Sequence, residues 1–412
     1  MTDVQPIPHP PVICVRPPLR WRFTLAGQAG GRVRIAYVTE TWFPSVNGVV
    51  TRLAATVSEL TRRGNQVLVV APHVSGPGDW QEPPGTTVRH VPSVGLPFIY
   101  GGQPWGLPLP RVVGLLDRWV PDLVHAVSPT LLGWAGVLHA HRRGLPLVCS
   151  YHTHVPRYAH YYHLGFAEGP AWALIRRAHR RAHVNLAASE ASRDELQAHG
   201  VRDVRIWRGA VDLDQFHPRY ASADLRRRLT DGHPERRVCL YVGRLAAEKG
   251  VERLLPLAAA DGDRHVALVG DGPAKAELER VFTGLQATFV GGLAGRELSA
   301  AYASADVFVF PSTTDTLGLV MLEAMASGLP VVAARTPASC GLLDRAPAGD
   351  VFDPADTESL LAAVRRWLGT PLDRRRLADQ ARDQLATWER ATSELLTEYD
   401  RAIARAGRRA AA

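Results

Sequence analysis

Two basic residues, Arg244 and Lys249, lie five positions apart in the segment GRLAAEKG, at the end of the apolar run 238–243. A strand followed by such a segment predicts a strand-to-helix turn, where side-chain cations and free backbone amides suit a phosphate group. Lys249 is one of only two lysines in the chain, whereas arginine occurs 46 times. The segment therefore indicates a phosphate site, and the alternative is a surface ion pair between Glu248 and Lys249.

A second group of candidates follows the apolar run 306–311, where the sequence reads STTDTLGLVMLEAMASG. We expect residues 316–319 to form a loop with exposed amides and residues 320–326 to form a helix. Asp315 precedes this helix and Glu323 lies about one turn inside it. Carboxylates near a helix start complement its dipole, and they can equally accept hydrogen bonds from sugar hydroxyls. The segment therefore either caps a helix or binds a hydroxyl-rich ligand.

A third candidate, Gly48, follows the apolar run 33–38 and stands beside Asn47, a pair typical of a tight turn. We expect a helix to begin near Val49, so amides of the turn and of the helix start suit an anion. A plain turn glycine is the alternative here. The turn GDGP at 270–273 likewise follows an apolar run and precedes a predicted helix.

Patterns for metal binding or nucleophilic hydrolysis are weak. One segment concentrates histidines, namely His152, His154, His160 and His163. Their spacing matches no standard zinc motif. Asp-x-Asp triplets occur at 212–214 and 261–263, but both lie in predicted turns away from the phosphate motifs. We therefore expect no metal site, and the lack of a Ser-His-Asp nucleophile elbow argues against a hydrolase.

The elements that must position these residues are ten short apolar runs that alternate with helical stretches. The runs lie at 33–38, 66–71, 122–127, 146–151, 184–189, 238–243, 265–270, 287–292, 306–311 and 329–334. Such alternation is typical of parallel sheets with crossover helices, and ligands bind beyond the carboxyl ends of such strands. The sequence therefore predicts an α/β protein with two doubly wound, Rossmann-like domains facing a cleft.

Domain boundaries follow from a turn-rich stretch at 207–218, which we expect to link an N-terminal domain, 32–206, to a C-terminal domain, 219–385. Residues 1–31 are rich in proline and are predicted to be a disordered leader. Residues 386–412 are predicted to form a tail and a helix that packs back across the domains.

The composition, with 46% hydrophobic and 21% charged residues, is that of a globular protein. No run of 18 apolar residues occurs, so we expect no membrane-spanning helix, and the proline-rich start does not resemble a secretory signal. The four cysteines are widely spaced and are expected to be reduced thiols. A net charge of +8 admits anionic partners, but no nucleic-acid-binding motif accompanies the arginines, so we expect no nucleic acid partner.

Together, the motifs GRLAAEKG, GDGP, YASADVFVFPS and DTLGLVMLEAMASGLPVVA resemble the family 4 retaining glycosyltransferases of the GT-B fold. YVTETWFPSVNGV, SYHTHVPRYAHYYHLG and RGAVDLDQF further resemble the sulfoquinovosyl-diacylglycerol synthases and related glycolipid mannosyl- and glucosyltransferases. The resemblance covers about residues 32–405. It implies transfer of a sugar, with retention, from a GDP- or UDP-linked donor to a lipid acceptor such as diacylglycerol. We expect no metal or other cofactor, because fixed cations can stabilise the charge of the departing diphosphate.

For the reacting centre, the resemblance implies that Arg244 and Lys249 bind the donor diphosphate and neutralise its charge as it leaves. His152 matches a family histidine near the reacting sugar. Asp315 stands where the family has a glutamate that touches the transferred sugar, and is one methylene shorter. A second departure lies at 335–340, which reads RTPASC where the family usually has a Gly-Gly-x-Pro-Asp loop.

For the rest of the donor, the resemblance implies that amides of Leu317, Gly318 and Leu319 cradle the phosphates. Glu323 would accept hydrogen bonds from the ribose, and Gly48 matches a glycine loop that closes on the diphosphate. Two other functions stay open: transfer to a soluble glycan or small metabolite, and non-catalytic binding of a nucleotide-sugar.

A lipid acceptor requires access to a membrane, and one segment offers it. In AWALIRRAHRRAHV (171–184), Arg176, Arg177, Arg180 and Arg181 would form one basic stripe on a helix. Such a stripe attracts an anionic membrane surface. We expect a cytoplasmic protein attached peripherally to the inner face of the membrane, and the alternative is an ordinary solvated helix face.

Overall fold

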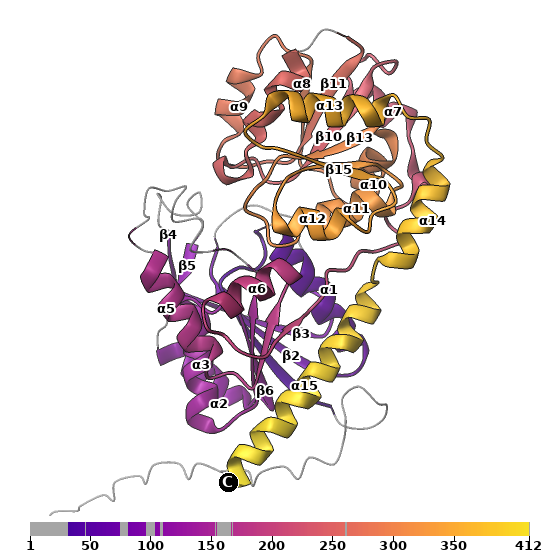
Figure 1. The fold of residues 1–412 in the computed structure, drawn as a ribbon. Coiled ribbons are helices and arrows are strands. Elements are labelled where there is room, and N and C mark those ends of the chain that lie inside the picture. The colour runs from indigo at the N-terminus through magenta and orange to yellow at the C-terminus, as the bar shows by residue number, and fades with distance from the viewer. Residues whose placement is uncertain are drawn as a thin grey trace, which may run out of the picture.

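The computed structural model describes residues 32–45, 47–74, 81–95, 104–107, 110–152, 154, 166, 168–259 and 262–411. Within them the chain forms two α/β units, drawn one above the other in Figure 1. We call them the N-terminal unit, built on a seven-stranded sheet, and the C-terminal unit, built on a six-stranded sheet. The predicted leader, His160 and His163 lie outside the described residues.

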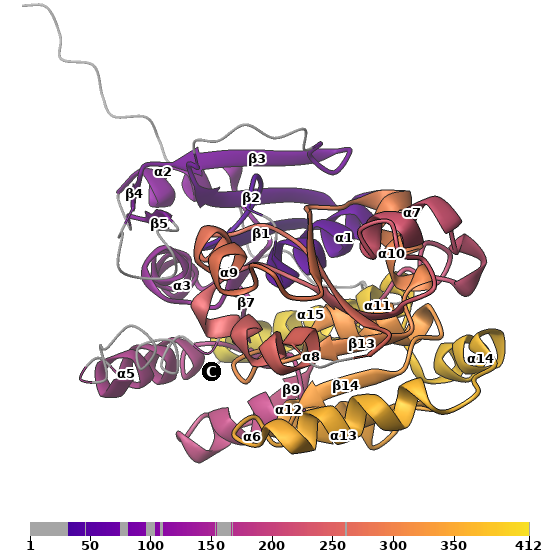
Figure 2. The ribbon, with the colours of Figure 1, turned by 90° about the horizontal axis from the view of Figure 1, so that it is seen from above.

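The sheet of the N-terminal unit is parallel throughout, in the order β3-β2-β1-β6-β7-β8-β9. Its strands are β1 (Arg34–Thr39), β2 (Gln66–Pro72), β3 (Thr86–Val91), β6 (Leu123–Val127), β7 (Leu147–Tyr151), β8 (Val184–Ala187) and β9 (Val204–Ile206). Figure 2 shows β1, β2 and β3 side by side. The helices are α1 (Gly48–Arg62), α2 (Pro110–Trp119), α3 (Leu131–Arg143), α5 (Glu168–His179) and α6 (Glu190–Ala198), and β4 (Ser93–Gly95) pairs with β5 (Pro104–Gly106).

The C-terminal unit repeats this plan with a parallel sheet in the order β12-β11-β10-β13-β14-β15. Its strands are β10 (Arg237–Val242), β11 (Arg264–Val269), β12 (Ala287–Gly291), β13 (Val307–Phe310), β14 (Val331–Ala334) and β15 (Gly349–Phe352). The α-helices are α7 (Ala223–Leu229), α8 (Leu255–Ala259), α9 (Lys275–Val281), α10 (Gly295–Ser304), α11 (Leu319–Ala326), α12 (Pro337–Leu343), α13 (Thr357–Leu368) and α14 (Arg374–Gln384). Three short 3₁₀ helices are η3 (Pro218–Tyr220), η4 (Ala247–Lys249) and η5 (Val251–Leu254).

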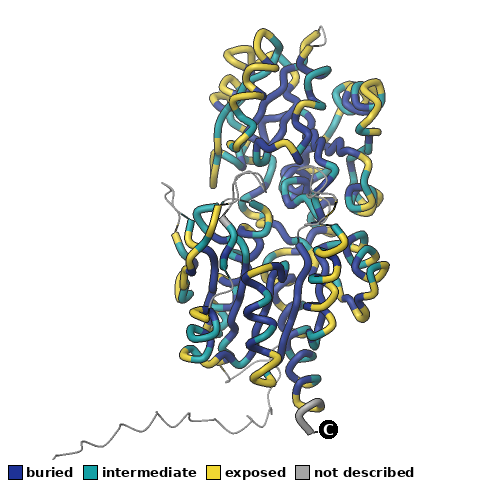
Figure 3. Tube along the Cα trace, turned by 90° about the vertical axis from the view of Figure 1, so that its left-hand side faces the viewer, coloured by how far each residue is buried: buried dark blue, intermediate teal, exposed yellow. Residues whose placement is uncertain are grey.

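The predicted fold class is confirmed, because both sheets are parallel and helices connect their strands. Each of the ten apolar runs contains a strand, and most of these strands are buried on both faces (Figure 3). This burial explains their near-continuous Val, Leu and Ala composition. In each sheet the strand order reverses beside the first strand, β1 or β10, and such reversals are where ligands bind.

The last helix, α15 (Trp388–Ala411), leaves the C-terminal unit and runs down the side of the N-terminal unit (Figure 1). Leu395, Leu396, Tyr399 and Ile403 belong to the buried cluster that contains Ile35 and Tyr37 of β1. The hydroxyl of Tyr399 lies 2.6 Å from that of Tyr37 and 2.7 Å from Nδ1 of His125. The C-terminal helix is therefore part of the core of the N-terminal unit.

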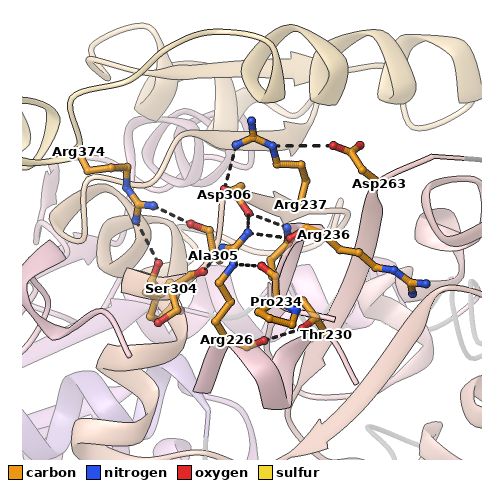
Figure 4. A network of polar contacts seen from close by, with 12 residues as sticks. Arg226, Thr230, Pro234, Arg236, Arg237, Asp263, Ser304, Ala305, Asp306 and Arg374 are labelled. Atoms are coloured by element: carbon orange, nitrogen blue, oxygen red, sulfur yellow. Dashed lines mark hydrogen bonds and ion pairs between the residues drawn. The ribbon is translucent and has the colours of Figure 1, made fainter. Parts of the chain in front are cut away.

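Two arginines of the C-terminal unit, Arg226 and Arg374, have structural roles. Arg226 is half-buried and donates hydrogen bonds to the carbonyls of Pro234, Arg236 and Ser304 and to the Asp306 carboxylate (Figure 4). Arg374 donates in the same region to the carbonyl of Ala305 at 2.6 Å. These contacts fix α7 and α14 against the C-terminal sheet. Among the described residues, no helix combines the length and apolarity that crossing a membrane requires.

Candidate active site

The two phosphate-site candidates meet because β10 and β13 are neighbours in the sheet, so the loops after them lie side by side. Lys249 Nζ donates to both carboxylate oxygens of Asp315, at 2.6 and 2.8 Å. Their side chains are 16% and 22% exposed, so the pair is largely screened from bulk water. The fold thus joins two candidates that are 66 residues apart in the sequence.

Arg244, the second cation, pairs with Glu248, whose side chain is fully buried. The alternative prediction of a surface pair between Glu248 and Lys249 is therefore wrong, because each cation has a different carboxylate. The backbone carbonyl of Glu248 also accepts a hydrogen bond from Thr314 Oγ1 at 3.0 Å, which ties the two loops together.

Charge pairing determines the ionisation of Asp315. Burial alone would raise the pKa of this carboxyl, but the Lys249 ammonium lowers it below its ordinary value through charge and hydrogen bonding. Asp315 is therefore a carboxylate at neutral pH, and its two hydrogen bonds fix the position of the Lys249 ammonium.

The GDGP turn lies against the segment that carries Arg244. A Cβ added at Gly270 would lie 1.9 Å from the carbonyl oxygen of Gly243, and one added at Gly272 would lie 2.2 Å from that of Leu245. No side chain fits at these distances, so both glycines are required for the close approach of the two backbones. The GDGP turn therefore packs directly against the backbone of the segment that carries Arg244.

Helix α11 begins at the same place. Gly318 adopts a left-handed conformation, with φ of 70°, immediately before Leu319. Within the described part of the chain, the amides of Leu317, Gly318 and Leu319 make no hydrogen bond, so this helix start presents free donors. The predicted helix is confirmed, with its start one residue earlier than expected.

Glu323 lies on α11 and accepts a hydrogen bond from the Tyr302 hydroxyl at 2.8 Å. Burial raises the pKa of Glu323 to about 7, and the hydrogen bond from Tyr302 opposes this rise. Tyr302, on α10, is a partner that the sequence analysis did not identify. Its only sequence signal is an aromatic residue in the YASAD motif.

The N-terminal unit contributes the opposite wall. Gly48 begins α1, and the Asn47 side chain caps this helix by accepting from the amides of Val49 and Val50, both at 3.0 Å. A Cβ added at Gly48 would lie 3.9 Å from Leu319 Cδ1. The starts of α1 and α11 therefore face each other across the two units.

His152 follows β7 and is buried, with 6% exposure. Its carbonyl oxygen accepts a hydrogen bond from Thr316 Oγ1 at 2.8 Å, so the loop before α11 touches the N-terminal unit here. Burial, together with the nearby Arg52 guanidinium, lowers the pKa of His152 well below its ordinary value. The imidazole is therefore neutral at physiological pH.

Arg52, on α1, is a site residue that sequence reasoning missed. It is 2% exposed and has no carboxylate partner among the described residues. Its guanidinium donates to the carbonyls of Trp207 and Arg208, lies 4.3 Å from the Trp207 ring centroid, and places Nη1 3.4 Å from Nδ1 of His152. Burial lowers its pKa to about 9, so it stays protonated at neutral pH.

This contact determines the tautomer of His152. A protonated guanidinium only donates, so Nδ1 is the acceptor and the ring proton is on Nε2. Within the described residues Nε2 has no partner, so the wall presents one buried, unpaired N–H donor. The sequence signal for Arg52 was an arginine in line with Thr56 and Leu60 on the buried face of the predicted helix.

Other residues singled out in the sequence have local roles. His154 pairs with Glu195 at 2.7 Å, and Asp212 Oδ1 accepts from the amides of Asp214 and Gln215 in a turn. In the divergent 335–340 segment, Thr336 and Ser339 form a reciprocal capping box at the start of α12. Among the described residues, no group of three or more potential metal ligands lies together.

The basic stripe lies on α5 and just beyond it. Arg176 and Arg177 belong to α5, whereas Arg180 and Arg181 follow its end at His179. Arg176, Arg177 and Arg180 are exposed, but the Arg181 guanidinium stacks 5.4 Å from the Trp134 ring centroid. The prediction of one continuous helical stripe is therefore wrong in its second half, because the helix ends before those two arginines.

Comparison with known proteins gives consistent results. The family model of Glycosyltransferase Family 4 matches residues 46–215, and that of glycosyl transferases group 1 matches residues 228–384. The chain is 38% identical over 384 residues to sulfoquinovosyl transferase SQD2 of Arabidopsis thaliana, which covers 90% of this chain and 74% of that protein. It is 38% identical over 389 residues to a GDP-mannose-dependent alpha-mannosyltransferase of Mycolicibacterium smegmatis, covering 92% and 100% of the two chains.

Among solved structures, a sucrose-phosphate synthase from Thermosynechococcus elongatus superposes with a TM-score of 0.72 at 21% identity, covering 89% of this chain and 98% of that one. At this identity the similarity concerns the fold alone. The sequence relatives extend over nearly all of both units and over the motifs that form the cleft. From this similarity and the geometry of the two walls, we conclude that the chain belongs to the family 4 glycosyltransferases and has their GT-B fold.

Proposed function

We propose that this glycosyltransferase moves a sugar, with retention and without a metal, from a GDP- or UDP-linked donor to a lipid such as diacylglycerol. The observation that carries the proposal is the hydrogen bond from Thr316 to the carbonyl of His152. It puts the free amides of α11, the Lys249–Asp315 pair and the His152 ring at one place between the units.

In this proposal Arg244, Lys249 and the amides of 317–319 bind the donor diphosphate. The departing diphosphate gains negative charge as the glycosidic bond breaks, and fixed positive groups lower the energy of that state. Lys249 would then share its ammonium between Asp315 and a phosphate oxygen. Two side-chain cations can serve the role that a metal ion has in other transferases, so the proposal needs none.

The remaining candidates contact other parts of the donor. Glu323 would accept hydrogen bonds from the ribose, and Gly48 would let the start of α1 approach the diphosphate. Asp315 and the Nε2–H of His152 would contact the transferred sugar, one as acceptor and the other as donor. The similarity to a sulfoquinovosyl transferase and the motif resemblance to glycolipid synthases support a lipid acceptor.

Nucleotide release from a panel of GDP- and UDP-sugars, measured with and without lipid extract, tests this function. We expect release from one donor to rise strongly with lipid, a new glycolipid by mass spectrometry, and an unchanged anomeric configuration by NMR. Stimulation by soluble glycans instead would favour the second acceptor class. Nucleotide-sugar binding without release under any condition would favour a non-catalytic protein and contradict the proposal.

Peripheral attachment to the anionic, cytoplasmic face of a membrane is the second part of the proposal. Arg176, Arg177, Arg180 and Arg181 line one shallow depression of the surface, and basic residues near such a membrane gain roughly 1 kcal/mol each. Because Trp172 and Ile175 of the same helix are buried in the core, attachment would rest on charge and weaken with salt.

Sedimentation with vesicles containing phosphatidylglycerol tests the attachment. We expect binding at low salt, release at high salt, and loss of binding when the four arginines are replaced by Gln. The control replaces four exposed arginines of the C-terminal unit, Arg365, Arg366, Arg375 and Arg376, and should pellet like the wild type. Equal pelleting of both quadruple variants would show that the stripe is not the anchor.

A further inference from the structure

A pocket of about 810 Å³ lies at the amino ends of β8 and β9, at the edge of the N-terminal sheet opposite the cleft. The end of α5, the loop between α6 and β9, and the last turns of α15 surround it. Figure 1 shows this end of α15 at the base of the N-terminal unit, far from the C-terminal unit. The pocket is therefore separate from the site described above.

Its lining is strongly basic. Arg180, Arg202, Arg405 and Arg408 line the pocket, and Asp203 is its one carboxylate. Arg405 pairs with Asp203 at 2.5 Å and donates to the carbonyl of His183 at 2.8 Å. Within the described residues, the guanidinium groups of the other three have no carboxylate partner. The pocket therefore has an unbalanced positive charge that an anion would neutralise.

A buried histidine adds a different kind of group. His179, which is also part of the lining, is fully buried, and its Nδ1 lies 3.0 Å from the Asn185 side-chain oxygen. The Asn185 amide nitrogen donates to the carbonyl of Arg202 at 3.2 Å, which fixes the orientation of the amide. Nδ1 is therefore the donor, because the amide oxygen can only accept.

The other ring nitrogen of His179 is then an acceptor. Burial lowers the pKa of His179 to about 4, so the ring is neutral at physiological pH. Its Nε2 has no partner among the described residues. A buried acceptor left unpaired costs free energy, and a ligand that donates an O–H bond would satisfy it once the side chains that cover the ring move aside. The pocket thus combines several cations with one unsatisfied acceptor.

We propose that this pocket binds a phosphate group that itself carries a hydroxyl or has one beside it. The arginines match the phosphate oxygens, which guanidinium groups bind through paired hydrogen bonds, and His179 matches the hydroxyl. Two sources have this chemistry: the headgroup of an anionic phospholipid and a free phosphate compound. The proposal does not depend on the sugar donor or on transfer activity.

Calorimetric titration of the full chain with inorganic phosphate and with sulfate tests the pocket. We expect phosphate to bind several-fold more tightly than sulfate, because at neutral pH only phosphate keeps an O–H that can donate to His179. Arg202→Gln with Arg408→Gln should weaken phosphate binding at least tenfold. The charge-matched control, Arg375→Gln with Arg376→Gln in the C-terminal unit, should bind like the wild type.

The donor site could also bind phosphate, so Lys249→Ala is a necessary comparison and should leave the pocket's affinity unchanged. Equal binding by the Arg202/Arg408 variant and its control would overturn the proposal, as would loss of binding in Lys249→Ala alone. Equal affinity for phosphate and sulfate would overturn the role of His179. Thermal unfolding of each variant confirms that it is folded.

Two further arms identify the source of the phosphate. Glycerol 3-phosphate is titrated as the free compound, and phosphatidylglycerol vesicles are compared with phosphatidylcholine vesicles in sedimentation. Pelleting with phosphatidylglycerol that the Arg202/Arg408 variant loses assigns the pocket to a lipid headgroup. If the wild type binds glycerol 3-phosphate and the Arg202/Arg408 variant pellets like the wild type, the pocket is assigned to a free phosphate compound. Binding of neither overturns the proposal.

Discussion

The two walls of the cleft hold their charges in opposite ways. On the C-terminal wall each cation has a carboxylate of its own, Glu248 for Arg244 and Asp315 for Lys249. On the N-terminal wall, Arg52 is more deeply buried, and its described partners are backbone carbonyls of the linker and the His152 ring. The first wall is complete within one unit, whereas the second depends on the chain that joins the units.

The largest effect should come from the C-terminal wall. Replacing Lys249 by Ala removes a charge that acts on the leaving group, so kcat should fall by roughly 10²–10³-fold, as for loss of one preorganised stabiliser. The matched control is the only other lysine, Lys275, which pairs with Asp271 at 3.5 Å rather than with Asp315. Steady-state kinetics decide the point, and near-normal turnover in Lys249→Ala would contradict the role of this residue.

Two variants on the same wall should distinguish the residue that contacts the sugar from the residue that contacts the nucleotide. Asp315→Ala should lower the transfer rate by about 10²-fold, with a smaller loss of nucleotide affinity. Glu323→Ala should do the reverse and lower the affinity for the free nucleotide by about tenfold. Its hydrogen bonds to the ribose form whether or not the nucleotide carries a sugar. Calorimetry with the nucleoside diphosphate, run beside rate measurements, compares them. Equal losses of nucleotide affinity would refute this division.

Breaking the N-terminal wall should have a smaller effect on rate and a distinct effect on pH dependence. Arg52→Met removes the group that fixes the His152 tautomer, and we expect kcat to fall by about tenfold through loss of one hydrogen bond. Removing the guanidinium charge raises the pKa of His152, so activity should start to fall at a higher pH on acidification. Arg52→Lys should keep the wild-type pH profile better. Identical profiles for all three proteins would rule out this role.

The smallest effect concerns the proton on Glu323. Because its pKa is about 7, the group loses a proton between pH 6 and 8, and ribose hydroxyls bind its ionised form best. Nucleotide affinity should therefore rise several-fold across this range and level off above it. Tyr302→Phe removes the hydrogen bond that lowers the pKa, so the midpoint should move to higher pH. Glu323→Gln cannot ionise at this position, so it should lose the part of the pH dependence of nucleotide affinity that comes from Glu323. Any dependence that is left comes from ionisation of the nucleotide itself.

The strands were predictable wherever both faces are covered. Such strands are continuous apolar runs and account for nine of the ten predicted runs; the tenth run contains β12, a half-buried edge strand. Five strands escaped: β3, β9 and β15, which lie at edges of the two large sheets, and the three-residue strands β4 and β5, which pair only with each other. The edge strand β3 has mostly polar or half-exposed residues, and β9 has only three residues. A pattern based on burial cannot detect a strand that has little of it.

The site was predictable only as separate segments. Lys249 and Asp315 stand in short motifs that their local chemistry makes conspicuous, but their pairing depends on β13 lying beside β10. The chain visits β11 and β12 between these two strands, so sequence order does not reveal the contact. Arg52 was missed for another reason: among 46 arginines, its alignment with Thr56 and Leu60 on one helix face does not single it out until its burial is known.

The position of α15 has a consequence for how the protein is made. A ribosome delivers the N-terminal unit first, yet Leu395, Leu396, Tyr399 and Ile403, which fill its core, are translated after the whole C-terminal sheet. During synthesis the first sheet therefore has an uncovered apolar face, while the second unit can already close on itself. The domain that begins the chain is the last to mature, and a nascent chain stalled before residue 388 would expose this face to chaperones and proteases.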